Sequence, residues 1–367
     1  MRKRYTRRDF LRHAGQGGLA LATAKLLTGC GPWPVPAEVA APPATVTEKQ
    51  SRVVAVRGTD LAEMARAALA AFGGAAALIQ PRETVFLKPN LVGAGTSDHE
   101  LFSTGECTKP EIVVAVAEEC LRAGAGQVII GDAAQIDRFA WDKLLTLDGS
   151  TSLAAEAERL NLAFPGRVTL ACLNADTPAW DVIPSPNSGL GELRISSVVA
   201  RADRIISLPV LKTHRLTRLT LSLKNFMGVT PLATYQVAGV AYRIKLHEAP
   251  GGVESAFLDV VDRLRPDFTL IDASIGVEGN GPYAVPGAWG TTVDVRDRLG
   301  SWLLLASDDL VAADATAARI VGQDPAAVGH IVHAYSRGLG QMREDLITLD
   351  GAALAELTMA WQPAENL

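Results

Sequence analysis

Short β-branched runs alternate with Ala/Leu-rich segments through most of the chain, and this alternation restricts the fold more than any other feature. The strand candidates begin near residues 53, 84, 127, 167, 204, 268 and 302. The helix candidates cover residues 60–72, 110–123, 152–162, 253–264, 310–321 and 325–337. Strands that alternate with helices build βαβ units around a parallel sheet. The sequence therefore predicts an α/β protein with a mostly parallel sheet flanked by helices, in one large or two closely packed lobes.

Residues 1–29 have the features of a twin-arginine export signal. Arg7 and Arg8 are followed by the residues DFL and then by an Ala/Gly/Leu run that is too short to span a bilayer. The residues LTGC at 27–30 form a lipobox, after which the signal is cut and Cys30 receives lipid. A basic nucleic-acid-binding arm and an ordinary signal-peptide cut are the alternatives. We expect a protein exported to the periplasmic or cell-surface side and anchored to a membrane through lipid on Cys30.

The segment after the signal is rich in proline and has no periodic apolar pattern. Residues 31–50 contain five prolines, which favour an extended tether over a folded element. We divide the chain into four parts: signal 1–29, tether 30–50, α/β body 51–340 and C-terminal extension 341–367.

Charge and cysteine content exclude several classes of function. Loss of residues 1–29 removes seven Lys/Arg and one Asp, and the formal net charge moves from −5 to −11. Nucleic acid is therefore an unfavourable partner. Cys107, Cys120 and Cys172 form no C-x-x-C pair, which argues against an iron–sulfur cluster bound by this chain and against a zinc ribbon.

Polar residues follow the predicted strands at the positions where ligands bind in open α/β sheets. Ligands lie outside the carboxyl ends of parallel strands, and we expect the side chains there to converge. These residues are Lys88, Asn90, Asp132, Lys212, His214, Glu278, Asn280 and Asp309.

Lysine is the rarer cation after residue 29, with seven Lys against 21 Arg. Lys88, Lys212 and Lys224 nevertheless each lie beside an apolar run. An ammonium group suits a phosphate or carboxylate, and it becomes a base or nucleophile when desolvated. The alternative is that each is a strand-end lysine whose ammonium reaches solvent.

Other residues offer acid/base or metal-binding chemistry. His214 follows Lys212 by two residues, so it shares its side of an extended strand and is a candidate proton donor or metal ligand. Asp314 lies on an apolar helical face, where a carboxylate needs a lysine, a metal or a proton. Glu278 with Asp309 or Asp314 would supply acid/base groups or hold a divalent metal. The alternatives are a buried structural ion pair for Asp314 and a helix N-cap for one aspartate of the pair at 308–309.

The residues TKPE at 108–111 have the form of a capping box, in which Thr108 caps the helix and Glu111 reaches back. Cys107 would then precede a helix N-terminus. A packed small residue and a stabilised thiolate are the two interpretations of this cysteine.

With these residues in view, the chain resembles the domain of unknown function 362 family. The matching segments are VFLKPNLV, TKPEIVVAVAEECLRAGAGQVIIGDA, IISLPVLKTH, LSLKNFMGV, LIDASIGVEGNGP and LLASDDLVAADATAARIVGQDP, which lie within residues 53–328. Many members carry a fused ferredoxin module, whose cysteines this chain lacks. The resemblance marks Lys88, Asn90, Thr108, Asp132, Lys212, His214, Lys224, Asn225, Glu278, Asn280, Asp309 and Asp314 as site residues.

These observations predict an enzyme that acts on a small anionic molecule. Lys212, His214, Glu278 and Asp314 are the expected catalytic residues, and Lys88, Asn90, Thr108, Asp132, Lys224, Asn225 and Asn280 the expected ligand-binding residues. Asp309 and Asp314 are the metal-ligand candidates. A lipid-tethered protein that binds an anionic metabolite or metal complex is the first alternative, and a redox-associated protein is the second.

Overall fold

The computed structural model describes residues 48–92, 103–136, 138–175, 179–238, 242–285 and 287–365. The predictions for Arg7, Arg8 and Cys30, and for most of the proline-rich tether, lie outside these residues. Within them, no helix has both the length and the apolar character needed to cross a membrane.

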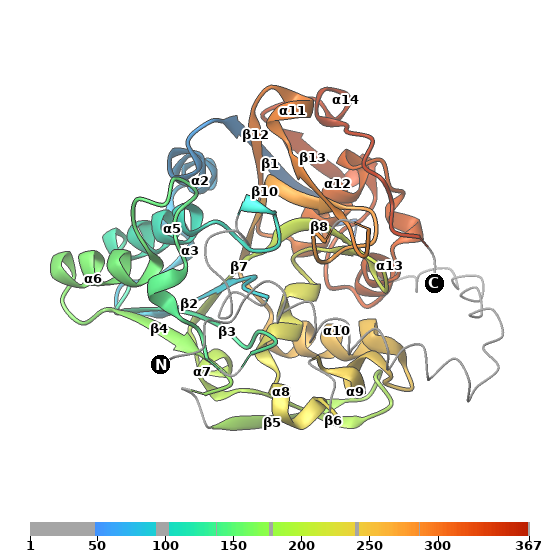
Figure 1. The fold of residues 1–367 in the computed structure, drawn as a ribbon, viewed down its shortest axis with the longest axis horizontal. Coiled ribbons are helices and arrows are strands. Elements are labelled where there is room, and N and C mark those ends of the chain that lie inside the picture. Colours follow the sequence, from blue (N-terminus) through green and yellow to red (C-terminus); the bar gives the residue numbers. More distant parts are fainter. Residues whose placement is uncertain are drawn as a thin grey trace.

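A mixed sheet of 11 strands runs through the described part of the chain (Figure 1). Strands β7, β2, β3 and β4 are neighbours and run parallel, β10 is parallel to β7, and β12 is antiparallel to both β10 and β1. The main path is β13 (Ile347–Asp350), β1 (Ser51–Gly58), β12 (Trp302–Ser307), β10 (Phe268–Glu278), β7 (Arg204–Leu208), β2 (Thr84–Pro89), β3 (Gln127–Asp132) and β4 (Val168–Cys172). The protein is thus α/β with a mostly parallel sheet.

The remaining strands extend or border this sheet. They are β8 (Val210–His214), β9 (Arg218–Thr220) and β11 (Thr291–Asp294) in the same sheet, and the separate hairpin β5 (Trp180–Ser185) and β6 (Gly191–Ser196). Strand β8 pairs with β10 in parallel and with β9 in antiparallel orientation. The β5–β6 hairpin lies at the bottom of Figure 1 beside α8 and α9.

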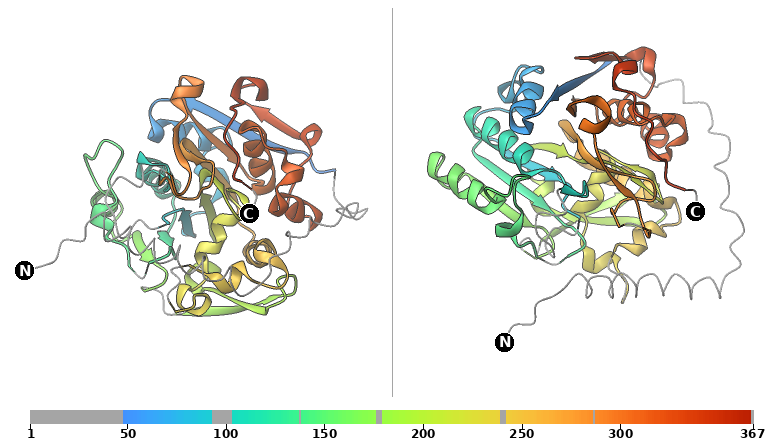
Figure 2. Two further views of the ribbon diagram at one scale, coloured as in Figure 1. Left: turned by 45° about the vertical axis from the view of Figure 1, so that its right-hand side comes forward. Right: turned by 45° about the horizontal axis from the view of Figure 1, so that its top comes forward.

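Helices cover both faces of the sheet, so its strands are buried on each side (Figure 2). Along β2, Val85 and Leu87 face one core cluster while Phe86 faces the other, as expected from the two-residue period of a strand. The first face carries α2 (Leu61–Ala70), α3 (Ala75–Leu78), α5 (Pro110–Arg122) and α6 (Leu153–Ala163). The second carries α7 (Ser197–Ala200), α8 (Leu232–Tyr235), α9 (Ile244–His247), α10 (Gly252–Leu264), α12 (Leu310–Ile320), α13 (Gly329–Ser336) and α14 (Leu354–Leu357).

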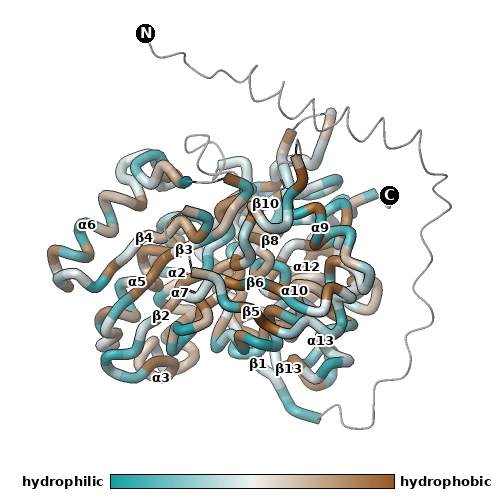
Figure 3. Tube along the Cα trace, turned by 90° about the horizontal axis from the view of Figure 1, so that it is seen from below, coloured by the Kyte–Doolittle hydropathy of each residue, from teal (hydrophilic) through white to brown (hydrophobic). Residues whose placement is uncertain are grey.

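Short elements complete the described chain: α11 (Arg296–Leu299) and the 3-10 turns η1 (Trp141–Lys143), η2 (Lys224–Val229), η3 (Pro325–Ala327) and η4 (Glu344–Leu346). Hydropathy follows this layering in Figure 3, where the outer helix α6 carries both hydrophilic and hydrophobic stretches. Such two-sided helices bury one face against the sheet and expose the other.

All seven predicted strands and all six predicted helices are present in the structure. The described part of the C-terminal extension, residues 341–365, packs against the body. β13 pairs with β1, and the side chains of Leu357, Met359 and Trp361 are buried in the core. The α/β body therefore extends well beyond residue 340.

Candidate functional site

A small cavity lies at the carboxyl ends of the adjacent parallel strands β7, β2 and β3. Lys88 is near the end of β2, and Asp132 ends β3. The cavity has a volume of about 90 Å³. Its lining includes Lys88, Asn90, Asp132, Gln135, Lys212, His214, Thr220, Lys224, Asn225, Gly228, Arg243, His247 and Pro282.

The β8–β9 hairpin contributes one wall of this cavity. Lys212 and His214 are two residues apart on β8 and both line it. Thr220 is the antiparallel partner of Lys212 in the ladder and lines the cavity as well. Two-residue periodicity thus places these side chains on one side of the hairpin.

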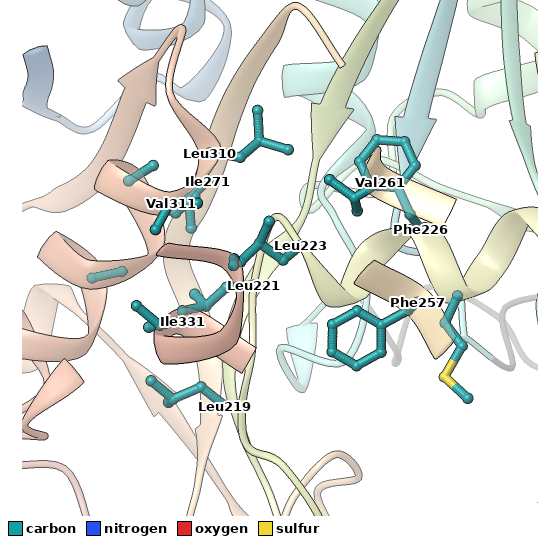
Figure 4. Packing of buried hydrophobic residues seen from close by; sticks show 14 of the residues in the cluster. Leu219, Leu221, Leu223, Phe226, Phe257, Val261, Ile271, Leu310, Val311 and Ile331 are labelled. Carbon is teal, nitrogen blue, oxygen red and sulfur yellow. The ribbon is translucent and has the colours of Figure 1, made fainter. Parts of the chain in front are cut away.

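Leucines alternate with polar residues over 219–224, so this segment presents polar groups to the cavity and apolar groups to the core. Leu219, Leu221 and Leu223 are fully buried and lie in a row in Figure 4. The intervening Thr220 and the following Lys224 line the cavity. Burial of the leucines therefore holds this polar edge in position.

Asp314 binds the backbone of this segment on the side away from the cavity lining. Its two oxygens accept hydrogen bonds from the amides of Ser222 (2.9 Å) and Leu223 (3.0 Å), immediately before Lys224. Burial raises the pKa of Asp314 to about 6, although nearby His330 and these hydrogen bonds lower it. The partner expected for Asp314 was a lysine, a metal or a proton. The structure supplies backbone amides instead, so Asp314 positions the segment that carries Lys224.

Two hydrogen bonds and one ion pair hold the Lys88 ammonium. Its ammonium lies 2.7 Å from Asp132 Oδ1 and donates to Pro89 O (2.8 Å) and Asn225 Oδ1 (3.2 Å). An ammonium has three donors. Burial lowers the pKa of Lys88, while the Asp132 carboxylate raises it. Although Lys88 borders the cavity, its contacts are those of a structural ion pair.

Asn225 and Asn90 connect the lysines. The Asn225 amide nitrogen donates to Lys88 O (2.7 Å) and Ser207 Oγ (3.1 Å), and its oxygen accepts from Lys88 and, at 3.4 Å, from Asn90 Nδ2. Asn90 Oδ1 accepts from Lys212 (3.0 Å). Asn225 is saturated, whereas Asn90 retains one N–H without a partner among the described residues.

Thr108 does not cap helix α5, contrary to the capping-box prediction. The N-cap is Lys109, which makes no side-chain cap, and Glu111 accepts from a backbone amide of another loop. The Thr108 hydroxyl donates to Leu208 O (2.6 Å) and accepts from the Asn90 amide (2.9 Å). Thr108 is absent from the cavity lining, and its hydrogen bonds fix the backbone of Asn90.

Among the described residues, Lys212 has one N–H group without a partner. Its ammonium donates to Asn90 Oδ1 and to Glu106 O (2.6 Å), which accounts for two of its three N–H groups. Burial lowers the pKa of Lys212 to about 8. Cys107 is also buried, and burial raises the pKa of its thiol, so the structure favours the packed thiol over the thiolate.

Lys224 is the least constrained of the three lysines. Among the described residues, its ammonium has no hydrogen-bond or ion-pair partner, although it lines the cavity. Desolvation lowers the pKa of Lys224 to about 7. The charge of Lys212 lowers it further, and Glu254 raises it.

His214 and His247 line the cavity as neutral imidazoles with opposite tautomers. His214 Nδ1 accepts a hydrogen bond from the Leu216 amide (3.1 Å), so its proton lies on Nε2. His247 Nδ1 lies 2.9 Å from Arg243 O, and a carbonyl only accepts, so Nδ1 carries the proton and Nε2 is free to accept. Desolvation, with Lys224 as the next cause, lowers the pKa of His214 well below 6.5 and that of His247 to about 4.

Arg243 and His247 were not predicted as site residues. Arg243 donates through Nε to Thr230 O (3.0 Å) and through Nη2 to the carbonyls of Thr230 and Ala133. In the described part of the chain, Nη1 has no partner. Burial lowers the pKa of Arg243 to about 10. Arg243 and His247 are four residues apart, and residues i and i+4 lie on the same face of a helix. This spacing is the sequence signal that could have identified them as a pair.

Besides Thr108 and Asp314, three further predicted residues lie outside the cavity lining. Glu278 accepts from Arg298 (2.9 Å), and Asn280 exchanges hydrogen bonds with Glu365. Asp309 caps helix α12. Nowhere in the described ranges do three or more His, Cys, Asp or Glu side chains form a group that could hold a metal. The expected carboxylate set beside the lysines is therefore not formed.

The lining has a strong excess of positive charge. Lys88, Lys212, Lys224 and Arg243 are its cations, and Asp132 is its carboxylate. Fold and site together define an α/β protein with a cationic cavity at the carboxyl ends of parallel strands. The chain belongs to the family described as Domain of unknown function (DUF362), whose model matches residues 85–319.

Several proteins are similar to this chain. "Thylakoid-associated protein sll1697" of Synechocystis sp. is 25% identical over 281 residues, which cover 77% of this chain and 76% of that protein. Among solved structures, the lactate racemase apoprotein from Thermoanaerobacterium thermosaccharolyticum has a TM-score of 0.35 at 13% identity, over 61% of this chain and 50% of that one. A protein from Thermotoga maritima has a TM-score of 0.38 at 10% identity, over 76% of this chain and 58% of that one.

Proposed function

We propose that the protein is an enzyme that binds a small anion in the cationic cavity and acts on it by proton transfer. The observation that carries this proposal is the set of unused donors. In the described structure these are one N–H of Lys212, three of Lys224, two on Nη1 of Arg243 and one on Nε2 of His214. Clustered cationic donors suit carboxylate or phosphate oxygens.

A second observation supports a polar ligand. Thr220 Oγ1 is buried, borders the cavity and has no hydrogen-bond partner among the described residues. Buried polar atoms normally have a partner, and an exception calls for an explanation. The cavity is small, at about 90 Å³, which suits a small anion.

The imidazoles of His214 and His247 favour an enzyme over a carrier. A binding protein needs only the cations, whereas His214 as donor and His247 as acceptor can move a proton in opposite directions within one cavity. Turnover of the bound anion distinguishes an enzyme from the lipid-tethered carrier.

Thermal unfolding with added anions tests the binding part. Phosphate, oxalate and acetate are added separately to the wild type, Lys224→Met and Lys245→Met. Lys245 is an exposed lysine outside the cavity lining and serves as the control. At least one anion is expected to raise the melting temperature of the wild type and of Lys245→Met but not of Lys224→Met. Equal shifts in all three proteins, or no shift in any, would refute the site.

We also propose that the chain is exported by the twin-arginine route and anchored through lipid on Cys30. The support is the order of basic residues, apolar run and lipobox within residues 1–30. The α/β body would then act outside the cytoplasm on a small anion, joined to the membrane by the proline-rich tether.

A further inference from the structure

We propose that Lys224 is a nucleophile that forms an imine with a small anion bearing an aldehyde or ketone, such as a 2-oxo carboxylate. This inference rests on the proposed anion site and names its substrate class. A lysine desolvated beside another cation is a recognised means of producing a neutral, reactive amine.

The surroundings of Lys224 differ from those of the two other lysines in the cavity. Lys88 has two hydrogen bonds and an ion pair and Lys212 has two hydrogen bonds, whereas Lys224 has no partner among the described residues. An amine without hydrogen bonds keeps its lone pair available once it is neutral. The pKa of Lys224, about 7, supports a substantial neutral fraction at neutral pH.

Lys224 also lies where a carboxylate and a carbonyl can be bound together. Lys212 and Arg243 border the same cavity and retain donors for a carboxylate. A 2-oxo carboxylate carries its carbonyl on the carbon next to that group. Its few heavy atoms suit a cavity of about 90 Å³.

The opposite tautomers of His214 and His247 match the proton transfers of imine formation. Lys224, His214 and His247 line the same cavity, and the charge of Lys224 lowers the pKa of both imidazoles. His214 offers a proton from Nε2, and His247 offers a lone pair on Nε2.

The reaction needs no oxidant or reductant. The lone pair of the neutral amine forms a C–N bond, and the carbonyl π electrons move to oxygen, which takes the proton of His214. His247 accepts the proton that the nitrogen loses. In the resulting carbinolamine, the nitrogen lone pair forms the C=N bond while the C–O bond breaks. The hydroxyl leaves as water with the proton that His247 had accepted, and the second nitrogen proton returns to His214, so both imidazoles end neutral. Amine and carbonyl thus give imine and one water.

Reductive trapping tests this proposal. The full-length protein is incubated near neutral pH with pyruvate or glyoxylate and sodium cyanoborohydride, and peptide mass spectrometry locates the reduced secondary amine. The expected adduct is on Lys224, absent from Lys224→Arg and unchanged in Lys245→Met. Lys224→Arg keeps the cation but cannot form the imine. A His214→Gln variant is expected to be trapped more slowly at the same residue.

The outcomes separate this proposal from the anion site. If pyruvate raises the melting temperature of the wild type but no adduct forms on Lys224, the nucleophile proposal fails and anion binding stands. If neither occurs and the anion panel also gives no shift, both fail. Adducts spread over exposed lysines, with Lys224 no more modified than Lys245, also overturn the nucleophile proposal.

Discussion

Lys88 Nζ lies 2.7 Å from Asp132 Oδ1, and both side chains are buried at the carboxyl ends of neighbouring parallel strands. The backbone of Gly228 closes over this pair. A Cβ atom at position 228 would lie 2.8 Å from Lys88 Nζ and would clash with Asp132 Oδ1. The turn that carries Asn225 can therefore pack against the Lys88–Asp132 pair only because residue 228 is glycine.

The Gly228→Ala variant is expected to lose about 1–3 kcal/mol of unfolding free energy, as overpacked sites do, and also to lose anion binding. Urea unfolding and thermal shift with phosphate measure the two effects. Gly166→Ala is the control, because its φ of 70° adds backbone strain in open space far along the chain from the site. It should lose stability yet keep the anion-induced shift; loss of that shift in Gly166→Ala would show that the binding defect is only a stability effect.

The lysines of the cavity should respond oppositely to removal of their charge. Lys88→Met leaves Asp132 buried without its ion pair, and breaking a buried pair costs about 3–5 kcal/mol. Lys224→Met removes a desolvated ammonium that has no partner in the described structure, so its unfolding free energy should be unchanged or higher. Urea unfolding near neutral pH compares them, and a similar loss in both would contradict the division into structural and functional lysines.

The sequence was sufficient to predict the convergence of Lys88, Asp132 and Lys212. Parallel strands end at the same edge of a sheet, so residues that follow them must meet there. The alternation of leucine with polar residues at 219–224 likewise follows from a two-residue period. These features are local consequences of strand geometry, and no tertiary information is needed to infer them.

Glu278 and Arg243 show where this reasoning fails. Strand β10 continues from Phe268 to Glu278 because its second half pairs with β8 and β11, so Glu278 lies beyond the edge at which the other strands end. Arg243 immediately precedes the four-residue helix α9, where no strand-end rule applies. For Asp314 the need for a partner was predictable, but backbone amides carry no sequence signal.

Asp314→Ala should damage the site indirectly. It leaves the buried amides of Ser222 and Leu223 without acceptors, and each unsatisfied group costs about 1–3 kcal/mol. Since these amides fix the segment before Lys224, anion binding should weaken with stability. Asp314→Asn keeps one acceptor and should lie between Ala and wild type in both measurements. A stable Asp314→Ala with normal anion binding would show that Asp314 does not position Lys224.

Cell fractionation and fatty-acid labelling test export and anchoring. A radioactive fatty acid should label the wild type and not Cys30→Ala, because the thiol is the expected site of lipid attachment. Replacement of both Arg7 and Arg8 by Lys should retain the protein in the cytoplasm. Labelled Cys30→Ala would end the lipoprotein proposal, and normal export of the double-lysine variant would indicate the general secretory route.

Anion affinity and imine formation should depend on pH in opposite directions. Binding of a simple anion needs charged Lys224 and Lys212, whose pKa values are about 7 and about 8. Affinity for oxalate, whose own charge does not change in that range, should therefore fall as pH rises through it. Arg243 keeps its charge there, because its pKa is about 10, and His214 and His247 stay neutral because their pKa values lie below it. Trapping of pyruvate on Lys224 needs the neutral amine, so at saturating pyruvate its rate should rise over the same range.

The pH dependence of the unfolding free energy gives an independent test of the lowered pKa of Lys224. The folded state lowers the pKa of Lys224 from 10.5 to about 7. Between these values the unfolded chain binds the extra proton, and unfolding free energy rises with pH by up to about 1.4 kcal/mol per unit. Below pH 7 both states are protonated and the full desolvation penalty remains. Lys224→Met should remove this contribution to the slope, measured by urea unfolding across the interval, whereas Lys245→Met should leave it unchanged. An unaltered slope in Lys224→Met would mean that Lys224 titrates normally, and the assigned neutral amine would be wrong.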